Sequence, residues 1–77
     1  MKLNTVNVIE VVDNNVTEVF SYTDNKKGNK EAEAMFAKLG KENGMKDGDL
    51  EASIENGYWN DEDEPANFYN VFITHSS

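Results

Sequence analysis

The segment from residue 3 to residue 12 is apolar on both of the faces that a β-strand presents. Its many β-branched residues favour a strand, and successive side chains of a strand point to opposite sides of the sheet. Each side of this strand receives three apolar residues, with Val6, Val8 and Val12 on one side and Leu3, Ile9 and Val11 on the other. A sheet that is covered on one side only normally carries polar residues on its second side. Both sides of this strand are therefore expected to be buried against other segments or another molecule.

Two further segments have strand character. The polar run 13–15 tolerates the left-handed backbone of a tight turn, so residues 3–12 and 16–23 are expected to form a β-hairpin. Alternation in the second strand of this hairpin places three residues on one face: Val16, Phe20 and Tyr22. Residues 67–75 are rich in aromatic and β-branched side chains and predict a last strand. This strand too is apolar on both sides, with Phe68 and Phe72 opposite Tyr69, Val71 and Ile73.

A helical pattern follows the hairpin. After the polar segment 24–28, apolar residues recur at the i, i+3, i+4 and i+7 spacing of an amphipathic helix, namely Ala32, Met35, Phe36 and Leu39. The charges of this segment complement the helix dipole, acidic at the start and basic at the end: Glu31, Glu33, Lys38 and Lys41. Gly44 suits the left-handed residue that ends a helix. We therefore predict one main helix, with Gly40 inside it permitting a close approach of another segment.

Residues 49–56 fit two templates. Leu50, Ala52 and Ile54 alternate as they would in a strand, whereas the whole segment consists of good helix formers and Gly57 is placed to cap a helix. The acidic residues that follow are poor partners for a strand. We favour a short second helix.

These segments predict an α+β fold in one domain, residues 1–77. A small antiparallel sheet, made of the N-terminal hairpin and the C-terminal strand, packs in two layers against one main helix and a short second helix. The order is ββααβ, or ββαββ if residues 49–56 form a strand. Because the chain has no cysteine, packing alone must stabilise this small domain.

One long and one short helix do not shield both sides of such a sheet. We therefore expect self-association, a homodimer through the apolar sheet face. The alternatives are a loop or another protein over that face. A β-bulge at Val8-Ile9 or Val11-Val12 would instead restore ordinary alternation and leave a monomer.

Negative charge is concentrated in the last 33 residues, which hold eight acids against the single base Lys46, while the whole chain has a net charge of -8 and no arginine. Such a surface repels phosphate backbones and attracts cations and basic proteins. The expected partner is a basic protein surface, and direct binding of nucleic acid or of a membrane is not expected.

An aromatic pair, Tyr58-Trp59, precedes an acidic run that ends at Pro65. Exposed Trp and Tyr often anchor interfaces, and acids around them would steer a basic partner. The alternative is that both rings cap the core. The candidate partner-binding residues are Asp47, Asp49, Glu51, Glu55, Tyr58, Trp59, Asp61, Glu62, Asp63 and Glu64.

The sequence does not favour an enzyme, so no catalytic residue, cofactor or metal ligand is assigned. His75, the single histidine, lies near the end of the chain, where a catalytic base would be poorly held. Asp47, Asp49 and Glu51 alternate like the start of a calcium loop, but the positions that require glycine and glutamate hold Ala52 and Tyr58. Weak cation binding by the acidic segment is a further alternative.

In size, acidity and the absence of arginine and glutamine, the chain is similar to the small inhibitors that bacteriophages direct at host nucleic-acid-handling proteins, including anti-CRISPR proteins and DNA mimics. The resemblance is one of composition, and no motif carries it. It implies a non-catalytic inhibitor that docks its acidic half onto a basic host protein. The alternative is a small homo-oligomeric housekeeping domain whose acids serve solubility. A cytoplasmic location is expected, because no apolar run has the length of a signal peptide or a membrane span.

Overall fold

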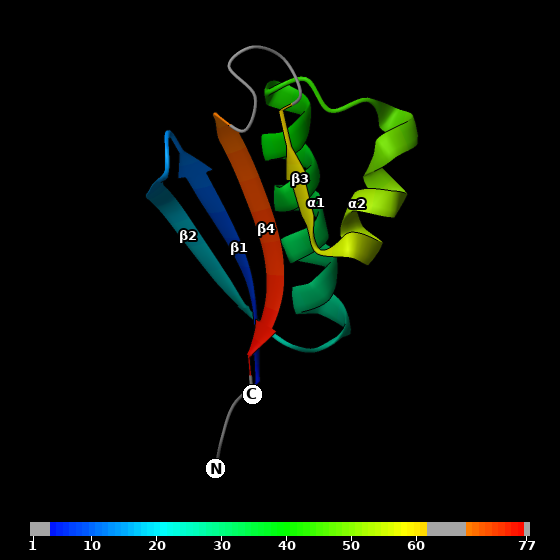
Figure 1. Ribbon diagram of the computed structural model, residues 1–77. Coiled ribbons are helices and arrows are strands. Elements are labelled where there is room, and N and C mark those ends of the chain that lie inside the picture. Colours follow the sequence, from blue (N-terminus) through cyan, green and yellow to red (C-terminus); the bar gives the residue numbers. More distant parts are fainter. Residues whose placement is uncertain (1–3, 62–67, 77) are drawn as a thin grey trace.

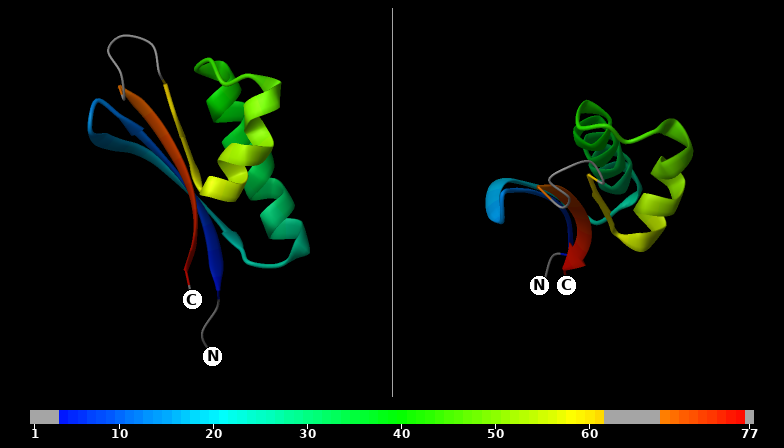
Figure 2. Two further views of the ribbon diagram at one scale, coloured as in Figure 1. Left: turned by 45° about the vertical axis from the view of Figure 1, so that its right-hand side comes forward. Right: turned by 45° about the horizontal axis from the view of Figure 1, so that its top comes forward.

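The computed structural model describes residues 4–61 and 68–76 and confirms the α+β class (Figure 1). The elements in chain order are β1 (Thr5–Val12), β2 (Asn15–Thr23), α1 (Lys26–Glu42), the 3-10 turn η1 (Asp47–Asp49), α2 (Leu50–Asn56), β3 (Tyr58–Asn60) and β4 (Tyr69–Ser76). The strands form one antiparallel sheet in the order β2-β1-β4-β3. Both helices lie on the same side of this sheet, so the fold has two layers (Figure 2). No helix in the described ranges is long and apolar enough to cross a membrane.

The sheet has one strand more than predicted. Residues 49–56 are helical, as favoured, and Gly57 ends α2 in the left-handed region with φ 88°. The chain then turns into β3, whose Tyr58 pairs with Phe72 of β4. A strand of three residues is too short to show any periodicity, which is why the pattern missed it.

The N-terminal hairpin is confirmed, with one correction. Its turn uses positive φ at Asp13 (51°) and Asn14 (65°). The β1–β2 register jumps from Glu10↔Glu18 to Val11↔Val16, so Thr17 is the extra residue of a β-bulge. The bulge moves Val16 off the face that holds Phe20 and Tyr22, and its side chain is exposed. The prediction that these three residues share a face was wrong for Val16.

Helix α1 begins earlier than the pattern indicated. Asn25 caps it by accepting a hydrogen bond from the backbone N–H of Gly28 at 2.7 Å. The first turn therefore carries Lys26 and Lys27 rather than the predicted acids, and the expected dipole match at this end was wrong. The other end agrees, with Lys41 in the last turn and Gly44 in the left-handed region just beyond it.

The core lies between α1 and the covered side of the sheet. Phe36 and Ala32 of α1 and Val6 and Val8 of β1 are completely buried, and Val71 of β4 joins them. The predicted helical stripe is therefore confirmed. Gly40 allows the close approach that was predicted, because the side chain of Met45 packs directly over it and would overlap a Cβ there.

Candidate protein-binding surface

A shallow groove of about 320 Å³ lies between α2 and the edge strand β3. Small side chains on one side of α2 form its first wall, and residues of β3 form the second. The lining residues are Asp49, Ala52, Ser53, Asn56, Tyr58, Trp59 and Asn60.

The apolar side of α2 fixes its orientation against the rest of the fold. Leu50 and Ile54 pack against the core, and Ser53 is buried with its hydroxyl donating to the carbonyl oxygen of Asp49 at 2.7 Å. At the end of the helix, the carbonyl oxygen of Gly57 accepts from the N–H of Ile73 at 2.9 Å, which ties α2 to β4. Residues on the remaining side of α2 must therefore point outward.

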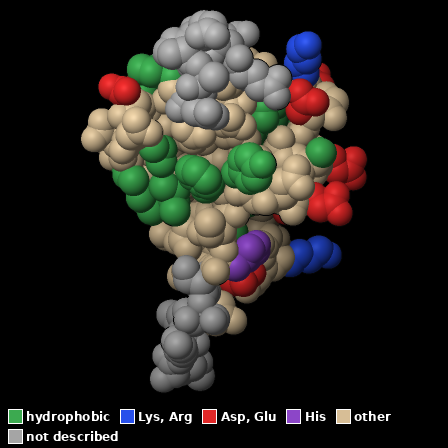
Figure 3. Space-filling model, viewed as in Figure 1, with side chains coloured by type: hydrophobic (Ala, Val, Ile, Leu, Met, Phe, Trp, Pro, Cys, Tyr) green, Lys and Arg blue, Asp and Glu red, His purple; other side chains and the backbone are tan. Residues whose placement is uncertain are grey.

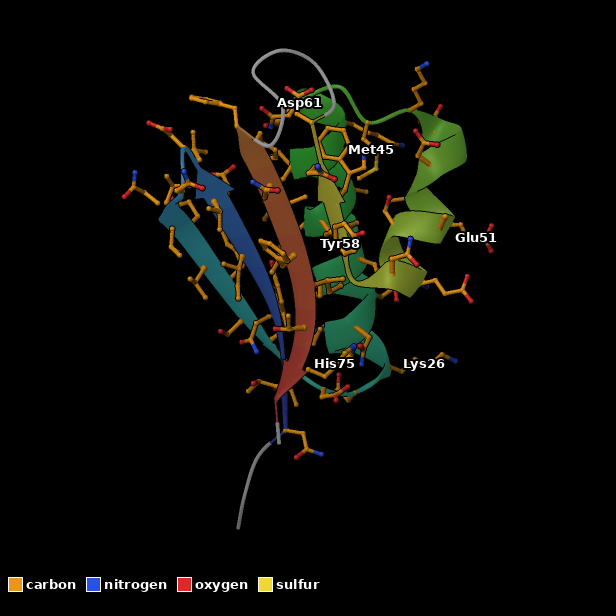
Figure 4. The ribbon with its side chains drawn as sticks, in the orientation of Figure 1. Lys26, Met45, Glu51, Tyr58, Asp61 and His75 are labelled. Carbon is orange, nitrogen blue, oxygen red and sulfur yellow. The ribbon has the colours of Figure 1, made fainter. Side chains whose placement is uncertain are left out.

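That outward side carries acids. Glu51 and Glu55 are one helical turn apart and exposed, and Glu51 points away from the sheet in Figure 4. Asp49 and Asp47 precede them in η1, where Asp47 pairs with Lys41 at 3.0 Å. Among the described residues, the side chains of Asp49, Glu51 and Glu55 have no ion pair or hydrogen bond. We call these three residues the α2 acids.

The two aromatic residues of β3 point to opposite sides of the sheet. Trp59 packs against the core on the helix side, with its ring centre 6.3 Å from that of Tyr69. Tyr58 lies on the other side, 50% exposed and 6.5 Å from the ring of Phe72. The two rings therefore do not form one aromatic anchor, although both contribute atoms to the groove.

The remaining candidate residues lie beyond β3. The backbone N–H of Asp61 donates to the carbonyl oxygen of Tyr69 at 3.0 Å, which holds the start of this segment beside β4. Glu62, Asp63 and Glu64 lie outside the described residues. The structure thus brings together the α2 acids, Asp47, Tyr58 and Trp59, all on or beside α2 and β3.

Sequence reasoning missed part of this groove. Ala52, Ser53 and Asn56 line it but were not candidates. The signal was present in their spacing, since Asn56 lies four positions after Ala52 and three after Ser53, and residues three or four positions apart lie on one side of a helix. This spacing identifies a common side only once the segment is known to be helical rather than extended.

His75 forms a surface cluster with Asp24 of the β2–α1 connection and Asn29 of α1. Its Nδ1 atom lies 3.4 Å from a carboxylate oxygen of Asp24, whose other oxygen accepts from the side-chain amide of Asn29 at 2.6 Å. The hydrogen bond from Asn29, with a smaller effect of His75, lowers the pKa of Asp24. Within the described ranges, no group of three or more His, Asp or Glu side chains is arranged to hold a metal ion.

A second perturbed group lies inside the two layers. The hydroxyl of Tyr69 donates to Oε2 of Glu10 at 2.8 Å, and Oε1 of Glu10 accepts from Thr17 at 2.6 Å. Burial, together with the neighbouring carboxylate, raises the pKa of Tyr69 well above its ordinary value. The contact links β4, β1 and the bulge of β2.

Comparison with known protein families, curated proteins and solved structures found no match to this chain.

Proposed function

We propose that this protein is a non-catalytic acidic binding protein that docks its α2–β3 side onto a lysine- or arginine-rich surface of another protein. The observation that carries the proposal is the exposure of the α2 acids, which lack cation partners among the described residues. They stand beside a groove that has Tyr58 and Trp59 in its wall.

The charge on this surface favours a protein partner with basic groups. Exposed carboxylates bring a basic surface toward α2 and accelerate the encounter. Contacts in the groove would then add apolar and hydrogen-bonding area, with Trp59 in its wall as the aromatic residue that could anchor the interface. Nucleic acid would be repelled by the same carboxylates.

The class of partner follows from this chemistry. Proteins that handle DNA or RNA carry rows of lysine and arginine that neutralise phosphates. A row of carboxylates on a small protein competes for such a groove. We therefore propose inhibition of a nucleic-acid-handling protein as the function, in line with the composition of phage inhibitors.

The test is capture from a bacterial lysate with the protein immobilised. Wild type is compared with Glu51→Gln/Glu55→Gln, which removes two α2 acids while keeping side-chain shape. The matched control is Glu31→Gln/Glu33→Gln, which removes two exposed acids of α1 and therefore has the same net charge as the α2 variant. A partner identified by mass spectrometry is then tested for displacement from its DNA or RNA.

We expect one basic protein to be retained by wild type and the α1 control at 0.1 M salt, and to be lost by the α2 variant. At 1 M salt, where the screening length falls from about 10 to about 3 Å, retention should fall at least tenfold. Equal retention at both salt concentrations, or equal loss in the two variants, would refute docking through the α2 acids.

A further inference from the structure

The side of the sheet that faces away from the helices carries an apolar row across all four strands. The strand register places Val19 of β2 opposite Ile9 of β1, Ile9 opposite Phe72 of β4, and Phe72 opposite Tyr58 of β3. Val11 and Val16 form a second apolar pair beside this row. We call this side of the sheet the open face.

Within the described part of the chain no helix covers this row: its central residues Ile9 and Phe72 are half-buried, and its ends and the neighbouring Val16 are exposed. Val16 is 62% exposed, Val19 55% and Tyr58 50%. Apolar side chains form a band across the middle of this face in Figure 3, and both helices lie on the other side of the sheet, to its right in Figure 2. A contiguous apolar band of this kind marks a contact surface.

Among the strand residues that the structure describes, the open face carries no charged side chain, although the chain has 15 acids. By register, the strand residues on this side are Thr5, Asn7, Ile9, Val11, Val16, Val19, Ser21, Thr23, Tyr58, Asn60, Asn70, Phe72 and Thr74, none of them charged. Glu10 and Glu18 point to the helix side. Polar groups at one end of the face already bond to one another, as Ser21 donates to the side-chain oxygen of Asn7 at 2.7 Å.

This absence of charged side chains indicates which kind of surface can pack against the open face. A basic partner finds no carboxylate on the open face to pair with, so charge complementarity directs it elsewhere. Two copies of this acidic chain repel each other through most of their surfaces. At the open face, no like charges of the two copies face each other. A second open face is therefore the surface that this one fits best.

The sheet edges favour packing face to face over pairing edge to edge. The outer strand β2 is distorted by the bulge at Thr17, and the opposite edge strand β3 has only three residues. Bulges and very short strands are the devices that keep edges from adding another strand. The face lacks any comparable protection.

The size of the open face is that of a weak dimer. Strands of eight residues, about 4.8 Å apart with a rise of about 3.3 Å per residue, give each copy a face of roughly 400 Å² before side-chain relief is counted. Two such faces come to roughly 800 Å² before that relief is counted, somewhat below the about 1,000 Å² that a specific interface is expected to clear, so the dimer should be a weak one. A dissociation constant on the order of 100 μM is therefore expected.

We propose that two copies of this protein pack their open faces together in a symmetric sheet-on-sheet homodimer. The central contacts are Ile9 and Phe72, with Val19 and Tyr58 at the two ends of the row. Stacked sheets lie about 10 Å apart, so the helix layers face outward. The dimer does not depend on the proposed function, but it would present two copies of the α2 acids on its outer sides.

The test is sedimentation equilibrium of the whole chain from 5 μM to 1 mM. We expect the weight-average mass to rise from 8.7 kDa toward twice that value. Val19→Lys and Phe72→Lys should each weaken the dimer at least tenfold, because each would bury a charged lysine in the apolar interface without a partner. The matched control Ala34→Lys adds the same charge at an exposed site on α1 and should leave the dissociation constant unchanged.

These lysine variants reduce the net negative charge, so general repulsion cannot explain a weaker dimer. Circular dichroism and thermal melting establish that each variant is folded. The amide resonances of Ile9, Val19 and Phe72 should shift on dilution of the wild-type protein, whereas those of α2 should not. A wild-type mass that stays at one chain at 1 mM, or a dimer unaffected by both lysine variants, would overturn the proposal.

Discussion

The two sides of the sheet are built from the same kind of sequence but end in different environments. Val8 of β1 is completely buried beneath α1, whereas Val19, on the neighbouring strand and the opposite side, is 55% exposed. The β1–β4 register runs unbroken from Thr5 to Val12, and the irregularity in the β1–β2 register places its extra residue, Thr17, in β2, so the predicted alternative of a bulge at Val8-Ile9 or Val11-Val12 is wrong. Apolar residues along one face of a strand thus indicate that this face is suited to burial. Which segment buries it depends on the side of the sheet to which the chain runs after the strand.

The largest effect is expected where the chain turns onto the covered side. Gly28, in the first turns of α1, lies against the backbone of Thr23, and a Cβ there would overlap the carbonyl oxygen. Backbone cannot move aside as a flexible side chain does, so Gly28→Ala should lower the free energy of unfolding by about 3 kcal/mol, the upper end for overpacking. Urea unfolding at 5 μM measures this.

The control for this prediction is Gly48→Ala. Gly48 also lies outside the sheet, but a Cβ there meets no atom within 4 Å. We expect a change below about 0.5 kcal/mol, typical of a surface site. Similar losses in the two alanine variants would show that the contact between Gly28 and Thr23 does not fix α1 over the sheet.

A matched pair of truncations compares the two sides directly. Val8→Ala removes two buried methyl groups and should destabilise the monomer by about 2 kcal/mol, from lost transfer energy and a cavity. Val19→Ala removes the same atoms from the open face and should change monomer stability by less than about 0.5 kcal/mol. Urea unfolding at 5 μM gives both values, and equal losses would contradict the difference between the faces.

Much of the fold was readable because its main elements are long enough to be periodic. The stripe of α1 and the turn at Asp13 and Asn14 follow from local patterns and were predicted. The start of α1 was not, because the cap by Asn25 acts through one hydrogen bond that overrides the unfavourable lysines after it. The bulge at Thr17 leaves no trace in an alternation pattern, so Val16 was assigned to the wrong face.

The candidate site was predictable in its charge but not in its geometry. Glu51 and Glu55 attract attention through composition alone, and their exposure on α2 agrees with that reading. Tyr58 and Trp59 were treated as one feature because they are adjacent in sequence. Adjacent residues of a strand point to opposite sides, and three residues gave no sign that this segment is a strand.

The smallest expected effect comes from a hydrogen bond on the covered side of the sheet. Tyr69 donates to Glu10 between the two layers, and its raised pKa means that the folded protein keeps the phenol neutral. This contribution to stability is fully present below about pH 10, the ordinary pKa of tyrosine, and is lost as pH rises further because the unfolded chain ionises first. Tyr69→Phe should cost about 1 kcal/mol at pH 7 through the lost hydrogen bond. The stability gap between wild type and variant, measured by urea unfolding from pH 7 to pH 11, should narrow above pH 10. A constant gap across this range would show that Tyr69 ionises equally in the folded and unfolded protein.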